Sequence, residues 1–365
     1  MCCLAPLTSA LLLLGTGSAQ QPTPAPVVSP AVSPAVSPAV SPAESRPNVA
    51  PAGSSLIVLG QGDSSVTVID GQTLERRAQF KVEQTPHEVA VSQDGRTAWV
   101  TLYGGPLPGT RVAVVDLEAG ELTHVMDLTP LSRPHGIARE GDGLWITVEA
   151  NRAVAHLDLD TGAVDRILGH GGSIGHMLAR DAERELIYVA NIASHDLSIL
   201  STAPGSSGPG GLTTVATAPE PEAIALSPDG GEVWLGHRKG GVLSIVDTTK
   251  REVTATIDAG SFPFRIAFAP DGATAYWTEP EQDRLTICDA TTREITERIA
   301  VPGGPTGFVL SPDGTWAYVS LIGAGEVAVV DLERGVVAHR LPVGAAPDGI
   351  AFAVIRPSTS PIETR

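Results

Sequence analysis

Three histidines, a glutamate and an aspartate occupy one equivalent position in successive repeats of this 365-residue chain. They are His87, His135, His176, Glu222 and Asp348, and the two remaining repeats have Phe264 and Thr306 there. Imidazole and carboxylate groups that converge on one axis can bind Zn²⁺, Cu²⁺ or Ni²⁺, or can serve as general acid and base. We therefore take the three histidines as candidate ligands of a divalent metal ion. A histidine at such a position could equally form a hydrogen bond to neighbouring backbone and serve only the fold.

The elements that must position these residues belong to a unit of about 42 residues that recurs seven times between Ser54 and Val354. Segments such as VTVID, VAVVD and LTICD alternate with a period of two, which is typical of half-buried strands. Most of these segments end in an aspartate, and Ser201 replaces the missing one: Asp70, Asp116, Asp158, Asp247, Asp289 and Asp331. We expect these side chains to make hydrogen bonds within turns and to take no part in chemistry.

Each unit contains four predicted strands, the first two joined by turns such as Pro270-Asp271-Gly272. Seven such units predict an all-β fold, a seven-bladed β-propeller of four-stranded antiparallel blades. The segment SLIVLG from Ser55 matches a second strand, whereas GIAFAV from Gly349 matches a first strand. Pairing of these N- and C-terminal strands in one composite blade would close the ring and remove the exposed sheet edges.

The first strand of each blade should begin at the face to which the link between the second and third strands returns. Loops at this upper face contribute a second group of candidates: Glu149, Asn151, Asn191, His195, His237, Arg238, Glu279, Glu281 and Asp283. Polar loops on a rigid scaffold can recognise a protein partner or a small polar ligand. The same residues could instead form a solvated rim.

Three blocks carry a resemblance to a known family: PHEVAVSQDGRTAWVTLYGG, PEAIALSPDGGEVWLGHRKG and PTGFVLSPDGTWAYVSLIGAG. They resemble the YVTN family of seven-bladed propeller repeats over nearly all of residues 54 to 354. The block PHGIAREGDGLWITVEANRAVAHLDLDTG also resembles repeats of the virginiamycin B lyase type, and lactonase-like propellers share the architecture. The YVTN resemblance implies a secreted or periplasmic protein and does not define an activity.

Outside the propeller, composition predicts three further segments. Residues 1–19 are similar to a signal peptide, 20–53 form a proline-rich disordered linker, 54–355 form the propeller, and 356–365 form a disordered tail. We therefore expect a secreted, periplasmic or cell-surface protein. The apolar run within residues 1–19 is too short to span a bilayer. Removal of the signal would leave Cys288 as the sole cysteine, so no internal disulfide is expected.

These features favour a monomeric binding or interaction module that uses its channel-mouth face. The net charge of −17 argues against a nucleic-acid partner, because such binding depends on Lys and Arg that neutralise phosphates. The alternative is an enzyme, either a metal-assisted lyase or a lactonase-type hydrolase, that uses His87, His135, His176 and Glu222.

Overall fold

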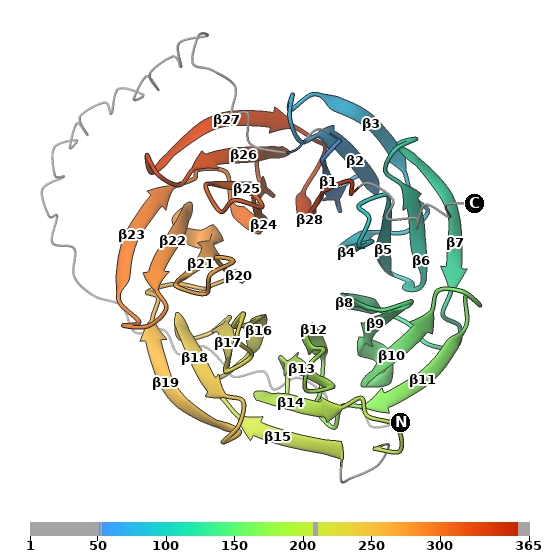
Figure 1. Cartoon of the computed structure of the whole chain (residues 1–365), viewed down its shortest axis with the longest axis vertical. Helices are drawn as coiled ribbons and strands as arrows, with labels where there is room; N and C mark the ends of the chain where they lie inside the picture. Colours follow the sequence, from blue (N-terminus) through green and yellow to red (C-terminus); the bar gives the residue numbers. More distant parts are fainter. Residues whose placement is uncertain (1–50, 52, 207–210, 357–365) are drawn as a thin grey trace, which may run out of the picture. The chain divides into compact units, whose positions relative to one another are not determined.

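The computed structural model describes residues 51, 53–206 and 211–356, which form seven four-stranded antiparallel sheets around a central axis (Figure 1). The predicted seven-bladed β-propeller is confirmed. The predicted signal peptide, nearly all of the proline-rich linker and all but the first residue of the tail lie outside the described residues. Within the described part of the chain, no helix is long and apolar enough to cross a membrane.

The blades follow one another in sequence, and in each blade the first strand is innermost (Figure 1). The first three complete blades are β4 (Pro86–Val91), β5 (Thr97–Gly104), β6 (Pro108–Asp116) and β7 (Glu121–Asp127); β8 (Pro134–Glu140), β9 (Gly143–Val148), β10 (Ala153–Asp158) and β11 (Val164–Gly169); and β12 (Gly175–Asp181), β13 (Leu186–Asn191), β14 (Asp196–Ser201) and β15 (Leu212–Ala216).

The next three are β16 (Pro221–Leu226), β17 (Glu232–His237), β18 (Val242–Asp247) and β19 (Glu252–Asp258); β20 (Arg265–Phe268), β21 (Thr274–Glu279), β22 (Arg284–Asp289) and β23 (Ile295–Ala300); and β24 (Pro305–Leu310), β25 (Trp316–Leu321), β26 (Glu326–Asp331) and β27 (Val336–Pro342). Two short 3₁₀ turns, η1 (Glu149–Asn151) and η3 (Pro280–Gln282), follow β9 and β21.

The two ends of the propeller close the ring in one composite blade. This blade consists, from the axis outward, of β28 (Pro347–Ala353), β1 (Ser55–Gly60), β2 (Ser65–Asp70) and β3 (Arg76–Lys81). Ser55 pairs with Ala353 and Ile57 with Ala351 across the antiparallel junction. The closure therefore has the strand order that the sequence predicts, and neither terminal strand is left as an open edge.

The core lies between adjacent blades, because the middle strands are buried on both faces. The largest fully buried side chains include Trp145, Trp234 and Trp277, all on second strands. Outer strands such as β3 alternate between exposed and partly buried residues. The apolar packing thus holds each blade against its neighbours and leaves the axis to the first residues of the inner strands.

The repeated aspartates form hydrogen bonds in the turns between third and fourth strands. Asp70 Oδ1 accepts from the backbone amides of Gln72 at 2.9 Å and Thr73 at 2.8 Å, and the other five aspartates accept equivalent bonds. Ser201 takes the same place, since its hydroxyl accepts from the amide of Ala203 at 3.3 Å. These turns lie at the end of the blades opposite to the start of the inner strands.

Candidate functional site

Contacts between blades hold the beginnings of the inner strands β8 and β12 in place. Thr101 on β5 donates a hydrogen bond of 2.9 Å to the carbonyl oxygen of His135, and Thr147 on β9 donates one of 2.7 Å to that of His176. The inner strands come so close that a Cβ at Gly136 would lie 2.9 Å from the His176 carbonyl oxygen. Glycine directly after the entry histidine therefore lets neighbouring blades bring their side chains together on the axis.

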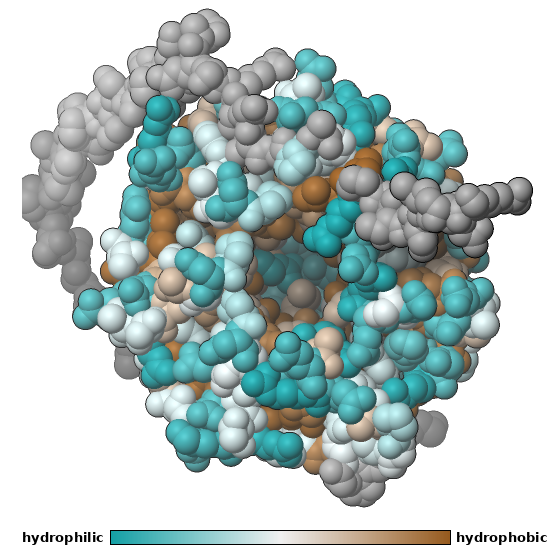
Figure 2. All heavy atoms as spheres, viewed as in Figure 1, coloured by the Kyte–Doolittle hydropathy of each residue, from teal (hydrophilic) through white to brown (hydrophobic). Residues whose placement is uncertain are grey.

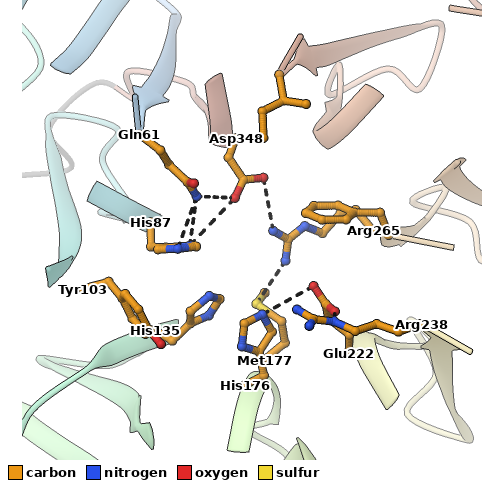
Figure 3. A pocket seen from close by; sticks show the side chains of 12 residues that line it. Gln61, His87, Tyr103, His135, His176, Met177, Glu222, Arg238, Arg265 and Asp348 are labelled. Carbon is orange, nitrogen blue, oxygen red and sulfur yellow. Dashed lines mark hydrogen bonds and ion pairs between the residues drawn. The ribbon is translucent and has the colours of Figure 1, made fainter. Parts of the chain in front are cut away.

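Six of the seven predicted entry residues line one cavity of about 310 Å³ at the channel mouth (Figure 3). They are His87, His135, His176, Glu222, Phe264 and Asp348. Thr306 is the exception, because its hydroxyl donates to the backbone oxygens of Ser320 and Pro347. Figure 2 shows the molecule hollowed on its axis, with hydrophilic residues inside the hollow.

The three histidines form a row of adjacent rings. The ring centroids of His87 and His135 are 4.3 Å apart, and those of His135 and His176 are 3.7 Å apart. His135, in the middle, is only 1% exposed, and neither of its ring nitrogens has a hydrogen-bond partner among the described residues. Burial holds the pKa of His135 well below its usual value, so this imidazole is neutral and has a free lone pair.

At one end of the row, His176 lies between two carboxylates. Its Nδ1 donates to Glu149 Oε1 at 2.6 Å, and its Nε2 lies 3.5 Å from Glu222 Oε1. Tyr103 donates a hydrogen bond of 2.7 Å to the second oxygen of Glu149, and Arg238 forms an ion pair with Glu222.

The ionisation of Glu149 and Tyr103 follows from these contacts. Burial alone would raise the pKa of Glu149, but the hydrogen bonds from His176 and Tyr103 hold that pKa below its usual value. Burial and the neighbouring Glu149 carboxylate raise the pKa of Tyr103 to about 12. Glu149 is therefore an anion and Tyr103 a neutral donor at neutral pH.

At the other end of the row, Gln61 connects His87 to Asp348. The Gln61 amide nitrogen lies 3.1 Å from His87 Nδ1 and donates to Asp348 Oδ2 at 2.6 Å. The same carboxylate oxygen lies 3.8 Å from His87 Nδ1. Burial lowers the pKa of His87 to about 4 although Asp348 opposes this shift, so His87 is neutral at pH 7.

Arg265 enters the cavity from the opposite side of the axis (Figure 3). Its guanidinium donates to Glu88 Oε1 at 2.6 Å and to Met177 Sδ at 3.0 Å, and it lies 4.0 Å from Asp348 Oδ1. Burial raises the pKa of Glu88, and the charge of Arg265 opposes that rise. Asp348 Oδ1 is buried and accepts no hydrogen bond from the described residues.

The structure groups potential metal ligands differently from the prediction of a three-histidine set. One ligand atom from each of His87, Glu88 and His135 lies within 4.8 Å of the other two, and the same holds for His135, Glu149 and His176. His135 belongs to both groups. Two histidines and a carboxylate, rather than three histidines, are therefore the sets that could hold an ion.

Two of the predicted rim residues join the cavity region, and three are buried in the blades. Glu149 contacts His176, and Arg238 lines the cavity. The buried residues differ from the expectation because their side chains bond within the chain: Asn191 to Asp196 and Ser198, His237 to Ser244 and the Pro219 carbonyl, and Glu279 to Ser261, Trp277, Arg284 and Thr286.

The remaining rim residues lie away from the cavity. Asn151 accepts a bond of 2.9 Å from the Ser132 amide, and His195 accepts one of 3.0 Å from the Glu220 amide. Glu281 is exposed in the first turn of η3. Asp283 accepts bonds from the amides of Gly303 and Gly304. These four residues do not line the cavity.

Sequence reasoning missed several residues that line the cavity: Gln61, Tyr103, Met177, Arg265 and Ile322. Three of them lie at the end of the second strand of a blade, as Glu149 and Arg238 do: Gln61 and Ile322 directly follow that strand, and Tyr103 is its last residue but one. Comparison of this strand-end position in all seven repeats would have identified these three residues. Met177 and Arg265 each directly follow an entry residue, and no separate pattern marks them.

No family model matches the chain, and no curated protein matches it. Solved structures do. One is a functionally unknown protein from Desulfotomaculum acetoxidans DSM 771, which is 14% identical to this chain with a TM-score of 0.69. The alignment spans 83% of this chain and 99% of that protein. Another is hydrazine synthase from Kuenenia stuttgartiensis, which is 17% identical with a TM-score of 0.63. The alignment spans 77% of this chain and 98% of the hydrazine synthase chain.

A third is dihydro-heme d1 dehydrogenase NirN in complex with DHE, which is 18% identical with a TM-score of 0.59. The alignment spans 86% of this chain and 77% of the NirN chain. At such identities the similarity extends to the fold alone. The seven-bladed propeller is thus confirmed, whereas the resemblance to YVTN repeats stays a prediction.

Proposed function

We propose that this protein is a binding module that takes a small, positively charged polar ligand at its channel mouth. The observation that carries this proposal is the position of Glu149 and Asp348 at opposite ends of the histidine row. Neither carboxylate has a guanidinium group within hydrogen-bond distance, since Arg265 donates to Glu88 and Arg238 pairs with Glu222. Arg265 comes within 4.0 Å of Asp348 Oδ1 but donates its hydrogen bond to Glu88, so the charge of Asp348 is only partly compensated. A buried carboxylate that is only partly compensated favours the binding of a cation.

The dimensions and the overall charge support a small cationic ligand. A volume of about 310 Å³ lies at the lower end of the range of small-molecule sites and is too confined for the surface of a folded partner. The net charge of −17 raises the local concentration of cations around the whole molecule. The inner strands that supply most of the entry residues are hydrogen-bonded into four-stranded sheets, which holds these side chains at the channel mouth before the ligand arrives.

Thermal denaturation with defined probes tests this proposal. In buffer with EDTA, spermidine and arginine amide should raise the melting temperature of the wild-type protein, whereas citrate and phosphate should not. Asp348→Asn should reduce the shift caused by the cations, and Glu281→Gln, an exposed carboxylate on the same face, should retain it. Equal shifts with anions, or full shifts in Asp348→Asn, would contradict a cation site.

A second candidate is an enzyme, either a metal-assisted lyase or a lactonase-type hydrolase. It is supported by the hydrogen-bonded series of Tyr103, Glu149 and His176, in which a carboxylate holds an imidazole that faces the cavity. A panel of lactones and aryl esters, assayed with and without added Zn²⁺, tests this candidate. Turnover that disappears in His176→Ala and survives in His195→Ala would favour the enzyme.

We also propose that the chain acts outside the cytoplasm. The apolar segment and the small residues before Gln20 support an exported precursor. Expression of the full chain in a bacterium, followed by fractionation and N-terminal mass analysis, should give a protein that begins near Gln20 outside the cytoplasm. An unprocessed cytoplasmic product would contradict export.

A further inference from the structure

We propose that the channel mouth binds a free basic α-amino acid, a ligand with a carboxylate, an α-ammonium group and a second positive charge on its side chain. The carboxylate binds Arg238, the α-ammonium binds Glu222, and the charged side chain binds Asp348. This inference rests on the proposed function, because it names the chemical class of the cation. It follows from the unused donors of Arg238, from two acceptors that face each other at His176, and from the positions of these charges around the ring.

Arg238 has hydrogen-bond donors that the fold does not use. It directly follows β17, lines the cavity and forms an ion pair with Glu222 through its Nε. This contact uses one of the five N–H donors of a guanidinium group, and no other hydrogen bond or ion pair of the Arg238 side chain occurs among the described residues. The side chain is also 44% exposed. Its terminal nitrogens are therefore accessible to a planar anion, and a carboxylate matches their spacing.

Two acceptor atoms face each other beside this arginine. His176 donates its Nδ1 proton to Glu149 Oε1 at 2.6 Å, so the lone pair of the neutral ring is on Nε2. That nitrogen lies 3.5 Å from Glu222 Oε1, which is long for a hydrogen bond. An ammonium group has three N–H donors and can satisfy both acceptors. An ammonium group at this point lies next to Arg238, as the α-ammonium and the carboxylate of one amino acid require.

A doubly protonated His176 is the alternative partner for Glu222. Its second N–H would face Glu222 Oε1 across 3.5 Å, which gives at best a weak hydrogen bond. It would also leave the terminal nitrogens of Arg238 without an anion. The head group of an amino acid supplies both missing partners, whereas protonation of the ring supplies only one.

Asp348 provides the binding point for the second positive charge. Its side chain is only 5% exposed, and its Oδ1 has no hydrogen-bond partner among the described residues, because Gln61 donates to Oδ2. Asp348 and Arg238 come from opposite sides of the ring: the blades of β20 and β24 separate them in one direction, and those of β4, β8 and β12 in the other. Figure 3 shows the two side chains on different sides of the cavity. A ligand that contacts both must therefore extend across the channel mouth.

The rest of the lining suits the chain between the two charged ends. Met177, Phe264 and Ile322 contribute apolar surface, against which the methylene groups of a basic side chain can pack. His135 lines the same cavity, and neither of its ring nitrogens has a hydrogen-bond partner among the described residues. A neutral imidazole has one donor and one acceptor. An amino acid carries both kinds of group and can satisfy it, whereas a protonated polyamine has donors only.

A series of arginine derivatives tests the inference on the wild-type protein. Isothermal titration calorimetry of the full chain in EDTA compares L-arginine with arginine amide, Nα-acetyl-L-arginine and L-citrulline, which lack the carboxylate, the α-ammonium and the side-chain charge, respectively. Each loss should weaken binding about 10- to 100-fold, because it removes a hydrogen bond between charged groups. Arginine amide has a higher positive charge than arginine, so attraction to an acidic protein alone would give the opposite order. Equal affinity for arginine and its derivatives would overturn the assignment.

Arg238→Gln tests the contact with the carboxylate. Binding of arginine should weaken by about 10-fold or more, whereas arginine amide should bind at least as tightly as to the wild type, because Glu222 loses its counter-charge. Lys239→Gln is the matched control, since Lys239 is an exposed neighbour that pairs with Glu220 and does not line the cavity. It should keep the preference for arginine. An equal fall for both ligands in Arg238→Gln would contradict the contact.

The outcomes of these titrations separate the inference from the proposed function. If spermidine and arginine amide bind but arginine binds no more tightly than arginine amide, the cation site stands and the assignment to an amino acid fails. If none of these cations binds, both proposals fail. A preference for arginine over all three derivatives, with the preference over arginine amide lost in Arg238→Gln, would support both.

Discussion

His176 Nδ1 donates a hydrogen bond of 2.6 Å to Glu149 Oε1, and the two residues come from neighbouring blades. Tyr103, from the blade before, donates a bond of 2.7 Å to the other oxygen of the same carboxylate. One buried anion therefore links three consecutive blades at the channel mouth. The position of the His176 ring depends on side chains contributed by its neighbours as well as on its own strand.

Tyr103→Phe tests this linkage, because it removes one hydrogen bond to Glu149 and keeps the ring. We expect the rise in melting temperature caused by spermidine to become smaller, since the carboxylate would lose one of its two hydrogen-bond donors and keep only His176. Thermal denaturation in EDTA, with and without spermidine, measures the change. Tyr276→Phe, a buried tyrosine on β21 that does not line the cavity, is the matched control. An unchanged rise in Tyr103→Phe would show that Tyr103 does not position the site.

The sequence was sufficient to predict the ring and the entry positions of the blades. Period-two alternation and regular turns repeat seven times, and the mismatch between the segments at Ser55 and Gly349 indicates the composite blade. Averaging over many repeats makes such a prediction robust. The entry position could be read in the same way, so six of its seven residues line the cavity.

Individual contacts of single side chains could not be predicted from the repeat. Glu279 is the last residue of β21 and Glu149 directly follows β9, so the two lie at similar places in their repeats. Glu279 is nevertheless fully buried among donors of its own blade, whereas Glu149 faces His176. This difference in burial depends on the rotamer of each glutamate and on nearby donors, which for Glu279 include Trp277 and Thr286. Arg265 likewise reaches Glu88 across the axis, 177 residues away in the chain. No local pattern encodes such a long-range pair.

Ala353→Asp tests the closure of the ring. Ala353 is 1% exposed, pairs with Ser55 and packs in the cluster that contains Ile57. A buried carboxylate without a partner should lower the free energy of unfolding by about 3–5 kcal/mol. Urea denaturation followed by tryptophan fluorescence measures this loss. Ala300→Asp, on an exposed outer strand, should change stability by less than about 0.5 kcal/mol. Equal stability of the two variants would contradict a structural role for the closure.

Asp70→Ala tests the assignment of the repeated aspartates to turns. The change removes the acceptor of two backbone amides, at 2.9 and 2.8 Å, so stability in urea should fall by about 1 kcal/mol. Asp70→Asn should retain most of the stability, because its amide oxygen can accept the same bonds. Both variants should keep the rise in melting temperature that spermidine causes in the wild type, since this turn lies at the opposite end of the blade. Loss of that rise in the alanine variant would assign the aspartate a role in the site.

His237 should make stability depend on pH. Its Nδ1 donates to the Pro219 carbonyl at 3.2 Å, and its Nε2 accepts from the Ser244 hydroxyl at 2.9 Å, so the neutral form satisfies both partners. Burial lowers the pKa of His237 to about 4. The unfolded chain, with a histidine pKa of about 6.5, binds the proton first as the pH falls. The contribution of His237 is therefore fully present above about pH 6.5 and is lost as the pH falls towards 4.

Urea denaturation of wild type and His237→Gln at pH 7, 6, 5 and 4.5 measures this contribution. The variant should be less stable at pH 7, because glutamine cannot reproduce both hydrogen bonds, and the difference should shrink by on the order of 2 kcal/mol at pH 4.5. Comparison with the variant is needed because burial also lowers the pKa of His87 and His170 to about 4, and these residues contribute to the slope of both proteins. A difference that stays constant over this pH range would mean that His237 binds its proton equally well in the folded and unfolded chains.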